Sequence, residues 1–219
     1  NSWYEFRGHR WFPVDGGYTL MNIISEDFVN EYLKVASDYN TAAISATGLE
    51  KEDLQKKASR FQRVVDKLLN LGFKENVMKE CRYQFYDEKF EDKLDEHHFL
   101  IGCENGVYDL EKSEFRNGKP DDFVTLTTKN SYIAWDENKP QAKNIKKFFS
   151  QILPDKDVRT YFLQALCTCL SGENREEKLY IPTGRGSNGK SLTFELVNLA
   201  LGEYYISCPI TIMTRKRGA

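Results

Sequence analysis

An eight-residue segment, Gly184-Arg185-Gly186-Ser187-Asn188-Gly189-Lys190-Ser191, constrains this chain more than any other feature. It fits G-x-x-x-x-G-K-[ST], the pattern of a loop that wraps around phosphate groups. The apolar run Leu179-Tyr180-Ile181 precedes it and predicts a short buried strand. Apolar residues then recur at helical spacing from Leu192 to Ala200, and Gly202 is a helix stop signal. The segment therefore predicts a strand, a phosphate-binding loop and a helix, in that order.

The residue types of this loop match the chemistry of a polyphosphate site. Gly184, Gly186 and Gly189 let the backbone turn sharply and approach dense negative charge without a Cβ in the way. Successive N–H groups then point at the anion, and the positive end of the following helix adds to their effect. We expect Lys190 to reach the β- and γ-phosphates and Ser191 to place its hydroxyl on Mg²⁺.

The chain is therefore predicted to bind ATP, or another nucleoside triphosphate, together with Mg²⁺. Lys190 is the predicted catalytic residue and Ser191 the predicted magnesium ligand. The alternative is a glycine-rich turn before an ordinary helix, but four fixed positions match by chance in a chain of this length only about one time in a hundred. The predicted contacts with the nucleotide are Gly184, Arg185, Gly186, Ser187, Asn188, Gly189, Lys190, Ser191 and Leu192.

Length and composition limit the classes of protein to which the chain can belong. The 219 residues suffice for one domain or slightly more, and 40% hydrophobic residues allow a core. A formal net charge of -2 gives no global attraction to nucleic acid or membrane, so any nucleic-acid surface must be local. No apolar run approaches the length of a membrane span, and the start at Asn1 without a signal peptide indicates a piece of something longer. Five cysteines without a C-x-x-C pair favour reduced thiols in a cytosolic compartment.

Upstream of the loop, the sequence predicts a separate domain over residues 1–172 that mixes helices with a small β unit. Residues 1–15 predict a hairpin, because aromatic residues flank Arg7-Gly8-His9 and Gly8 suits the turn. Apolar residues at helical spacing make residues 19–87 helical. The expected helices cover residues 19–39, 50–71 and 75–86, with a polar loop over 41–48.

Residues 97–135 predict the β unit. Asn105-Gly106 and Asn117-Gly118 separate short apolar runs there, and asparagine and glycine tolerate the positive φ that hairpin turns require. Residues 205–212 are also strand-like, although Pro209 interrupts them.

Residues 143–171 return to helical spacing, with helices expected over 144–152 and 155–170. The predicted fold class is thus an α+β domain, helical with a small antiparallel β unit. Over residues 173–219 it is followed by the first strand, phosphate loop and helix of an α/β nucleotide-binding domain, whose remainder this chain lacks.

Two further clusters have a functional and a structural interpretation. The arginines and tryptophans of the first hairpin are either a stacking platform for single-stranded nucleic acid or a half-buried aromatic ribbon with solvated arginines, and the second is favoured. A group of His and Cys residues lacks the spacing of a metal site, so a structural role is favoured there too. The clusters are Trp3, Arg7, Arg10 and Trp11, and His97, His98 and Cys103.

Hydrolysis needs groups beyond the phosphate loop. A carboxylate at the end of a later strand helps to hold Mg²⁺ and orient water, and ring-forming ATPases add an arginine from a neighbouring subunit. Both lie C-terminal to the loop in such folds. Only 28 residues follow Ser191 (219 minus 191), and they contain no apolar run that ends in two acidic residues. We therefore expect this stretch to lack the catalytic half of the domain.

An ordered set of segments resembles the primase-helicases of nucleocytoplasmic large DNA viruses, the group of the poxvirus nucleoside triphosphatase and its giant-virus and asfarvirus relatives. The opening WYEFRGHRWFPVD is similar to the start of the region before the helicase module in the giant-virus members. The likeness covers nearly the whole chain. The other segments are GCENGVYDL from Gly102 to Leu110, Phe115-Arg116 with Pro120-Asp121-Asp122, the helix from Tyr161 to Gly172, and the loop GRGSNGKS.

This resemblance implies a superfamily 3, AAA+-type helicase that unwinds DNA with ATP and Mg²⁺ at a replication fork. It also implies a homo-hexamer in the full-length protein, replication proteins as further partners, no membrane, and a viral replication site in the host cytoplasm. Lys190, Ser191, Asn188 and the loop glycines match the motif. No residue here matches the family's metal-binding carboxylate, sensor or arginine finger.

Two other functions stay open. The chain is alternatively a DNA-binding or oligomerisation module without activity of its own, for which Arg7, Arg10, the lysines at 143, 146 and 147, and Arg215-Lys216-Arg217 are the candidate residues. An unrelated P-loop kinase is disfavoured, because small nucleotide kinases open with the loop, whereas here it follows about 180 residues of other sequence.

Overall fold

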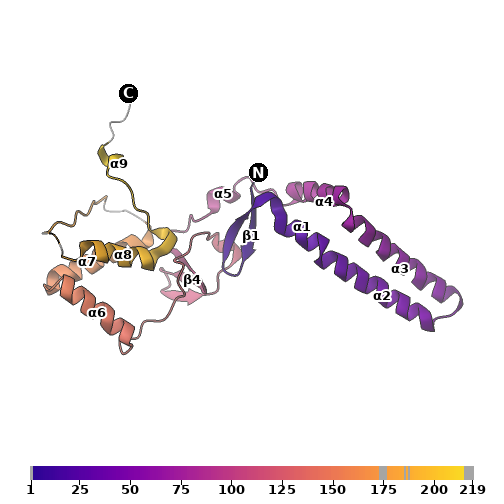
Figure 1. Ribbon diagram of the computed structural model, residues 1–219, viewed down its shortest axis with the longest axis horizontal. Coiled ribbons are helices and arrows are strands. Elements are labelled where there is room, and N and C mark those ends of the chain that lie inside the picture. The colour runs from indigo at the N-terminus through magenta and orange to yellow at the C-terminus, as the bar shows by residue number, and fades with distance from the viewer. Residues whose placement is uncertain (1, 173–176, 185, 187, 215–219) are drawn as a thin grey trace, which may run out of the picture. The chain divides into compact units, whose positions relative to one another are not determined.

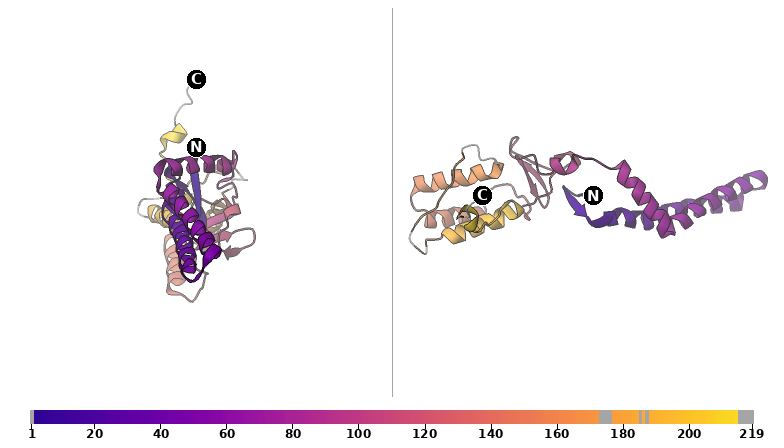
Figure 2. Two further views of the ribbon diagram at one scale, coloured as in Figure 1. Left: turned by 90° about the vertical axis from the view of Figure 1, so that its right-hand side faces the viewer. Right: turned by 90° about the horizontal axis from the view of Figure 1, so that it is seen from above.

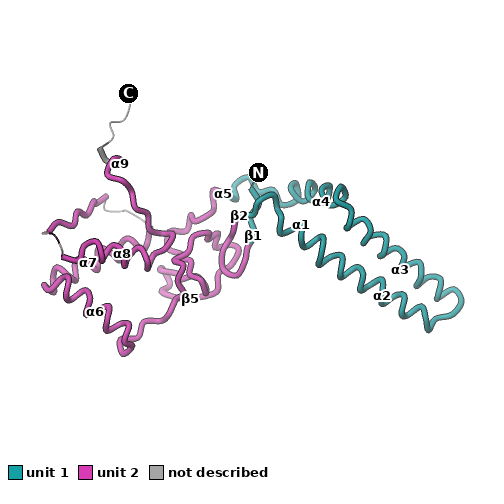
Figure 3. Tube along the Cα trace, in the orientation of Figure 1, with its two compact units in different colours: residues 1–5, 13–90 teal, residues 6–12, 91–219 magenta. Residues whose placement is uncertain are grey.

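A computed structural model describes residues 2–172, 177–184, 186 and 188–214 of the chain, which divides into two compact units (Figure 3). Unit 1 comprises residues 1–5 and 13–90, and unit 2 comprises residues 6–12 and 91–219. The first hairpin contributes to both units, because the open ends of its strands belong to unit 1 and the segment around its turn to unit 2.

The predicted hairpin is confirmed. Strands β1 (Trp3–Arg7) and β2 (Arg10–Val14) form a two-stranded sheet that turns at residues 8 and 9. Around the turn the guanidinium groups of Arg7 and Arg10 lie over the ring of Phe12, at 4.6 and 4.4 Å from its centroid. These contacts stabilise the tip of the hairpin, because an aromatic face attracts cations.

Unit 1 is a helical bundle. Its helices are α1 (Tyr18–Ser25), α2 (Asp27–Ser45), α3 (Gly48–Leu69) and α4 (Leu71–Gln84). The long helices α2 and α3 lie side by side and antiparallel in both views (Figures 1 and 2). The stripe of apolar residues predicted along this region forms the core, whose buried members are Ile24, Val29, Val65, Leu68 and Met78.

Three boundaries in unit 1 differ from the prediction, one of them the start of α4 at Leu71 rather than at residue 75. The helix expected over residues 19–39 is two helices, because the backbone of Glu26 bends at φ -114 and ψ -64 between α1 and α2. Residues 41–45, predicted as loop, belong to α2. Small side chains suggested a loop there, but alanine has the highest helix propensity, and Ala43 is buried in the bundle.

The β unit belongs to unit 2. Strands β3 (Leu100–Cys103), β4 (Gly106–Asp109) and β5 (Glu114–Arg116) form an antiparallel sheet in this order, with Leu100 opposite Asp109 and Val107 opposite Arg116. Short helices flank the sheet: α5 (Phe90–Lys93) precedes it and the 3-10 helix η2 (Pro120–Asp122) follows it. Residues 123–135, expected in the β unit, contain no strand.

One of the two predicted hairpin turns is wrong. Residues 104 and 105 do join β3 to β4, but the connection from β4 to β5 lies at residues 110–113 rather than at Asn117-Gly118. Gly118 instead lies against the first hairpin, where a Cβ would stand 2.2 Å from the carbonyl oxygen of His9. Glycine is required there by this close approach and not by a turn.

Helices α6, α7 and α8 of unit 2 were predicted. Helix α6 (Pro140–Ile152) begins at a proline, which suits the first turn of a helix, and Asp155 caps α7 (Lys156–Thr168) by accepting hydrogen bonds from the amides of Asp157 and Val158. After these come η3 (Cys169–Ser171), α8 (Lys190–Leu201), η4 (Gly202–Tyr204) and the short α9 (Thr211–Thr214).

Two predicted strands are not formed. Leu179, Tyr180 and Ile181 carry no strand and are 65%, 41% and 73% exposed. A strand needs a neighbour for its backbone hydrogen bonds, and within the described ranges all strands belong to the two small sheets above. Residues 205–212 likewise contain no strand and run into α9. The α+β part of the predicted fold class is thus confirmed, whereas the strand before the loop is not formed.

No helix in the described part of the chain combines the length and the hydropathy that a membrane crossing requires.

An ion pair links the end of the sheet to η2. Arg116 donates two hydrogen bonds to the carboxylate of Asp122, at 2.7 and 2.8 Å, and the amide of Lys119 donates a third at 2.7 Å. Burial alone would raise the pKa of Asp122, but the hydrogen bonds from Arg116 and Lys119 and their positive charges outweigh it and hold the pKa below its usual value. The ionised carboxylate therefore stabilises the folded state.

Replacing Asp122 should reveal this stabilisation. Asp122→Asn should lower the free energy of unfolding by about 2 kcal/mol at neutral pH, because hydrogen bonds to a charged group contribute about that much. Since the pKa is depressed on folding, the contribution is present above the unfolded pKa and is lost as the pH falls through the folded pKa, so the variant and the wild type should converge in acid. Urea unfolding measured from pH 7 to pH 3 tests this.

The neighbouring Asp121, which is exposed, supplies the matched control. Asp121→Asn should leave the unfolding free energy nearly unchanged at every pH. Equal effects of the two substitutions at neutral pH would contradict the role given to Asp122.

Candidate nucleotide site

The phosphate loop leads into helix α8 through Gly189. This residue is the N-cap of the helix, with φ 81 and ψ 2 in the left-handed region that favours glycine. A Cβ at this position would stand 2.8 Å from the Cδ1 atom of Ile152 at the end of α6. Both its conformation and its surroundings therefore require glycine, and the start of α8 is fixed against α6.

Thr193 anchors the first turn of α8. Its side chain is buried, and its hydroxyl donates a hydrogen bond of 3.0 Å to the carbonyl oxygen of Gly189, which also accepts the Thr193 amide at 2.9 Å. Thr193 was not among the predicted site residues. No feature of the sequence distinguished Thr193 from the other polar residues of this helix.

Lys190 extends back over the loop. Its ammonium group donates to Oδ1 of Asn188 at 2.8 Å and to the carbonyl oxygen of Gly184 at 3.4 Å. Gly184 and Asn188 are therefore close together, and the ammonium contacts both. Among the residues that the structure describes, Lys190 forms no ion pair, so the positive charge is balanced only by two neutral oxygens.

Three of the other predicted site residues lie in the described part of the chain. Gly186 has open space where a Cβ would be, and Ser191 and Leu192 are exposed on the first turn of α8. Arg185 and Ser187 lie outside the described residues. The structure thus brings together Gly184, Asn188, Gly189 and Lys190, while the assignment of nucleotide and Mg²⁺ contacts to them stays a prediction.

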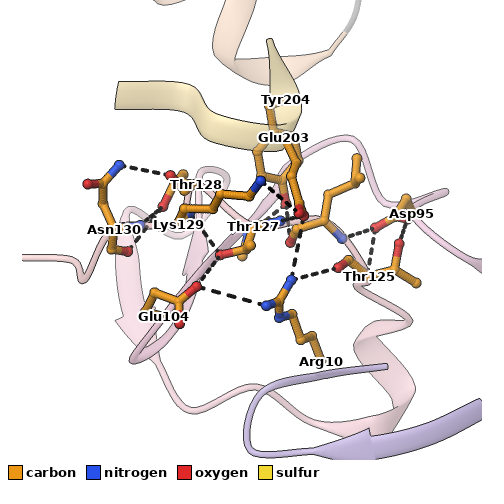
Figure 4. Close-up of polar contacts among 12 residues, drawn as sticks. Arg10, Asp95, Glu104, Thr125, Thr127, Thr128, Lys129, Asn130, Glu203 and Tyr204 are labelled. Carbon is orange, nitrogen blue, oxygen red and sulfur yellow. Dashed lines mark hydrogen bonds and ion pairs between the residues drawn. The ribbon is translucent and has the colours of Figure 1, made fainter. Parts of the chain in front are cut away.

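The other end of α8 contacts the β unit through a polar cluster (Figure 4). The hydroxyl of Tyr204, just after the helix, donates to the carbonyl oxygen of Leu126 at 3.1 Å and accepts from the amide of Gly102 at 2.8 Å. Burial is the main cause that raises the pKa of Tyr204 to about 12. The hydroxyl therefore keeps its proton and can make both hydrogen bonds at physiological pH.

Glu203 pairs with the extended segment of residues 124–130, here called the strap. Its amide donates to the carbonyl oxygen of Thr127 at 3.0 Å, and its carboxylate accepts from the amide of Thr127 at 3.0 Å. Asn130 of the strap donates to the carbonyl oxygen of Leu199 in the last turn of α8, at 2.8 Å. These bonds satisfy backbone groups that neither the helix nor a sheet pairs.

Arg10 joins the first hairpin to this cluster (Figure 4). Its guanidinium lies 3.5 Å from a carboxylate oxygen of Glu203 and 3.9 Å from one of Glu104, and it donates to the carbonyl oxygen of Thr125 at 3.3 Å. Lys129 contacts the other oxygen of Glu203 at 3.4 Å. Arg10 therefore has protein partners on several sides and does not belong to an open stacking platform.

A cavity of about 210 Å³ lies beside Tyr204, between the strap, the segment before β3 and the end of α7. His97 and His98 line it together with Cys169, whereas Cys103 is buried in β3, where desolvation raises the pKa of its thiol. No three His, Cys, Asp or Glu side chains within the described ranges are arranged to hold a metal ion.

Comparison with known proteins shows which family the chain belongs to and which viral proteins it is similar to. Residues 1–156 match the family described as "D5 N terminal like". The chain is 44% identical over 223 aligned residues to "Putative helicase L207/L206" of Acanthamoeba polyphaga mimivirus, an alignment that covers 99% of this chain and 23% of the relative.

Two further relatives come from other viruses. "Putative helicase 121R" of Invertebrate iridescent virus 3 is 34% identical over 151 residues, which cover 68% of this chain and 16% of that protein. "Putative primase C962R" of African swine fever virus (strain Badajoz 1971 Vero-adapted) is 27% identical over 149 residues, 67% of this chain and 16% of that protein.

These relatives are proteins of large DNA viruses that are named as putative helicases or as a putative primase. The chain belongs to the D5 N-terminal-like family. It spans less than a quarter of the length of these relatives, 23% in the mimivirus protein and 16% in the other two. The resemblance predicted from the ordered segments is thereby confirmed.

The geometry at Gly189 yields a prediction about stability. Gly189→Ala should lower the free energy of unfolding by about 3 kcal/mol, because alanine is strained in the left-handed region and its Cβ would collide with Ile152. Gly186→Ala is the matched control, since its Cβ would enter open space. Urea unfolding of the two variants checks this, and equal stability of both would show that α8 does not begin against α6.

Proposed function

We propose that this chain binds a nucleoside triphosphate with Mg²⁺ through residues 184–192, as part of an ATP-dependent viral replicative DNA helicase. The observation that carries the proposal is the placement of Lys190, whose ammonium lies over a closed loop and faces only neutral oxygens among the described residues. A cation in that position favours an anionic ligand, and the N-terminus of α8 adds its positive dipole end.

The residues of the loop suit a polyphosphate. Gly186 leaves open space for close approach of a ligand, and Gly189 has the left-handed conformation that leads into α8. On binding, the Lys190 ammonium would exchange its neutral oxygens for β- and γ-phosphate oxygens, which are the stronger partners because they carry charge. Asn188, freed from the ammonium, keeps a side-chain amide directed into the loop.

Ser191 suits Mg²⁺. Its side chain is exposed on the first turn of α8, next to Lys190, and a hydroxyl oxygen is a ligand that Mg²⁺ accepts. Bound Mg²⁺ supplies neutralisation of the phosphate charge. The chain's own contribution is to hold the phosphates in one orientation.

In the longer relatives the same region is proposed to serve a homo-hexamer that couples hydrolysis to DNA unwinding, with replication proteins as partners at a viral replication site in the host cytoplasm. The relatives named as helicase or primase support a role in viral DNA replication. Their names concern much longer proteins, of which this chain corresponds to a minor part.

A second candidate is a DNA-binding or oligomerisation module in which the loop is idle. The exposed Trp135 favours it, because Lys146 of α6 lies over its ring at 6.0 Å, and Lys143 and Lys147 are on the same helix. Such a cationic and aromatic surface suits single-stranded nucleic acid. The two candidates differ in one result, since only the first requires the isolated chain to bind nucleotide.

Lys190→Ala tests the proposal. The variant should bind Mg²⁺·ATPγS at least about tenfold more weakly than the wild type in calorimetric titration, because a charge-assisted hydrogen bond to phosphate is lost. Lys147→Ala, which removes an exposed lysine from α6, should bind like the wild type. Unchanged circular dichroism in both variants shows that the fold is intact.

Equal affinity of Lys190→Ala and wild type would contradict the proposed site. Binding of single-stranded DNA by a wild-type chain that does not bind nucleotide would support the second candidate instead, provided that the affinity falls steeply with salt.

A further inference from the structure

Helix α8 is held at both ends by parts of unit 2 that lie outside the phosphate loop. At its start Gly189 packs on Ile152 of α6, and at its end the turn formed by Glu203 and Tyr204 is bonded to the strap. Twelve residues separate the two ends, a length of about 18 Å at the helical rise per residue. A helix of this length moves as a rigid body, so a constraint at its end also fixes its start.

The strap forms no strand, and isolated backbone hydrogen bonds and side chains hold it. Its backbone bonds link Val124 to Trp11, Thr128 to Gly102 and Asn130 to Glu104. Asp95 accepts hydrogen bonds from the amides of Thr125 and Leu126, at 2.8 and 3.3 Å. The carbonyl oxygen of Leu126 accepts from the Tyr204 hydroxyl, and Thr127 pairs with Glu203. The Glu203–Tyr204 turn therefore holds the middle of the strap, at Leu126 and Thr127.

The contact between the end of α8 and the strap is also close, and substitution of Gly202 or Tyr204 would disturb it. Gly202, which ends α8, has φ 55 and ψ -118, and a Cβ there would stand 2.4 Å from the carbonyl oxygen of Thr128. Removal of the Tyr204 hydroxyl would leave the buried amide of Gly102 and the carbonyl of Leu126 without this partner. The end of α8 thus has one well-defined position on the strap.

The carboxylate of Glu203 also connects the turn to the first hairpin. Glu203 faces Arg10 at 3.5 Å and Lys129 at 3.4 Å, so the carboxylate links α8, the strap and the tip of the hairpin. All these residues belong to unit 2. Figure 4 shows the polar contacts that connect Glu203 with Arg10 and Lys129.

We propose that the Glu203–Tyr204 turn is a positioning element that couples occupation of the phosphate loop to the order of the strap. Tyr204 and Glu203 do not touch nucleotide in this account and act through α8. The inference rests on the proposed function. Because coupling between two sites is reciprocal, a strap that is held firmly favours nucleotide binding, and bound nucleotide orders the strap.

Tyr204→Phe is the decisive variant, since it removes one hydroxyl and keeps the ring. Without nucleotide, amide hydrogen exchange of residues 124–128 and 199–204 should become about tenfold faster, because two hydrogen bonds to backbone groups are lost. Mg²⁺·ATPγS should bind about tenfold more weakly. In the wild type, the same nucleotide should slow exchange in the strap, and in Tyr204→Phe this remote protection should be absent.

Two matched controls separate positioning from a general loss of structure. Tyr205→Phe alters the adjacent tyrosine, whose hydroxyl has no hydrogen-bond partner among the described residues, and should behave like the wild type. Glu203→Gln should keep the backbone pairing with Thr127 but weaken the contacts with Arg10 and Lys129, and its effect on nucleotide affinity should lie between those of wild type and Tyr204→Phe. Glu195→Gln on the exposed face of α8 is its control.

The experiments distinguish a failure of the coupling from a failure of the proposed function. Faster strap exchange in Tyr204→Phe with wild-type nucleotide affinity would overturn the coupling while leaving the proposed function intact. Absence of nucleotide binding by the wild type would overturn the proposed function, and the coupling with it. Unchanged exchange in Tyr204→Phe without nucleotide would show that the turn does not hold α8 on the strap.

Discussion

The double attachment of helix α8 is the constraint on which the candidate site depends. One end of the helix packs on Ile152 through Gly189, and the other is bonded to the strap through Tyr204. Because both ends are fixed, the first residue of the helix, Lys190, has a defined place over the loop. A cation held in place before the ligand arrives loses less freedom on binding than a mobile one, which is the physical advantage of such a scaffold.

Burial of polar groups explains why the attachment is specific. The Tyr204 hydroxyl is shielded from water and bridges an amide and a carbonyl that belong to different segments of the β unit. Apolar contacts alone would allow the helix end to slide on the strap, whereas hydrogen bonds with defined direction do not. Directed hydrogen bonds also connect β5 to η2, where Arg116 donates to Asp122.

Local patterns in the sequence predicted most of the secondary structure. Helical spacing of apolar residues identified α3, α4, α6, α7 and α8. In α3 the spacing corresponds to buried residues, whereas α7 buries none and α8 buries only Thr193. Turn residues identified the first hairpin at Gly8. The same reasoning failed at residues 41–45, where small side chains occur inside a helix, and at Asn117-Gly118, where glycine is needed for contact with His9.

The contacts that position the site could not be predicted from local patterns. Tyr204 meets residues that precede it by 78 and 102 positions, and Arg10 meets a carbonyl 115 positions later. No periodicity encodes such pairs, and Tyr204, Glu203 and Thr193 therefore escaped the sequence analysis. The exposed segment Leu179–Ile181 failed for a related reason, since a strand depends on a partner elsewhere in space. The loop residues, in contrast, are contiguous, so a local motif sufficed to propose them.

A crystal structure of the chain with Mg²⁺·ATPγS would test the nucleotide site most directly. The triphosphate should lie in the bend between Gly184 and Lys190, the Lys190 ammonium should contact phosphate oxygens instead of Gly184 and Asn188, and Tyr204 should keep its hydrogen bonds to Gly102 and Leu126. A nucleotide bound elsewhere on the chain, with Lys190 still on its two neutral oxygens, would rule out this site.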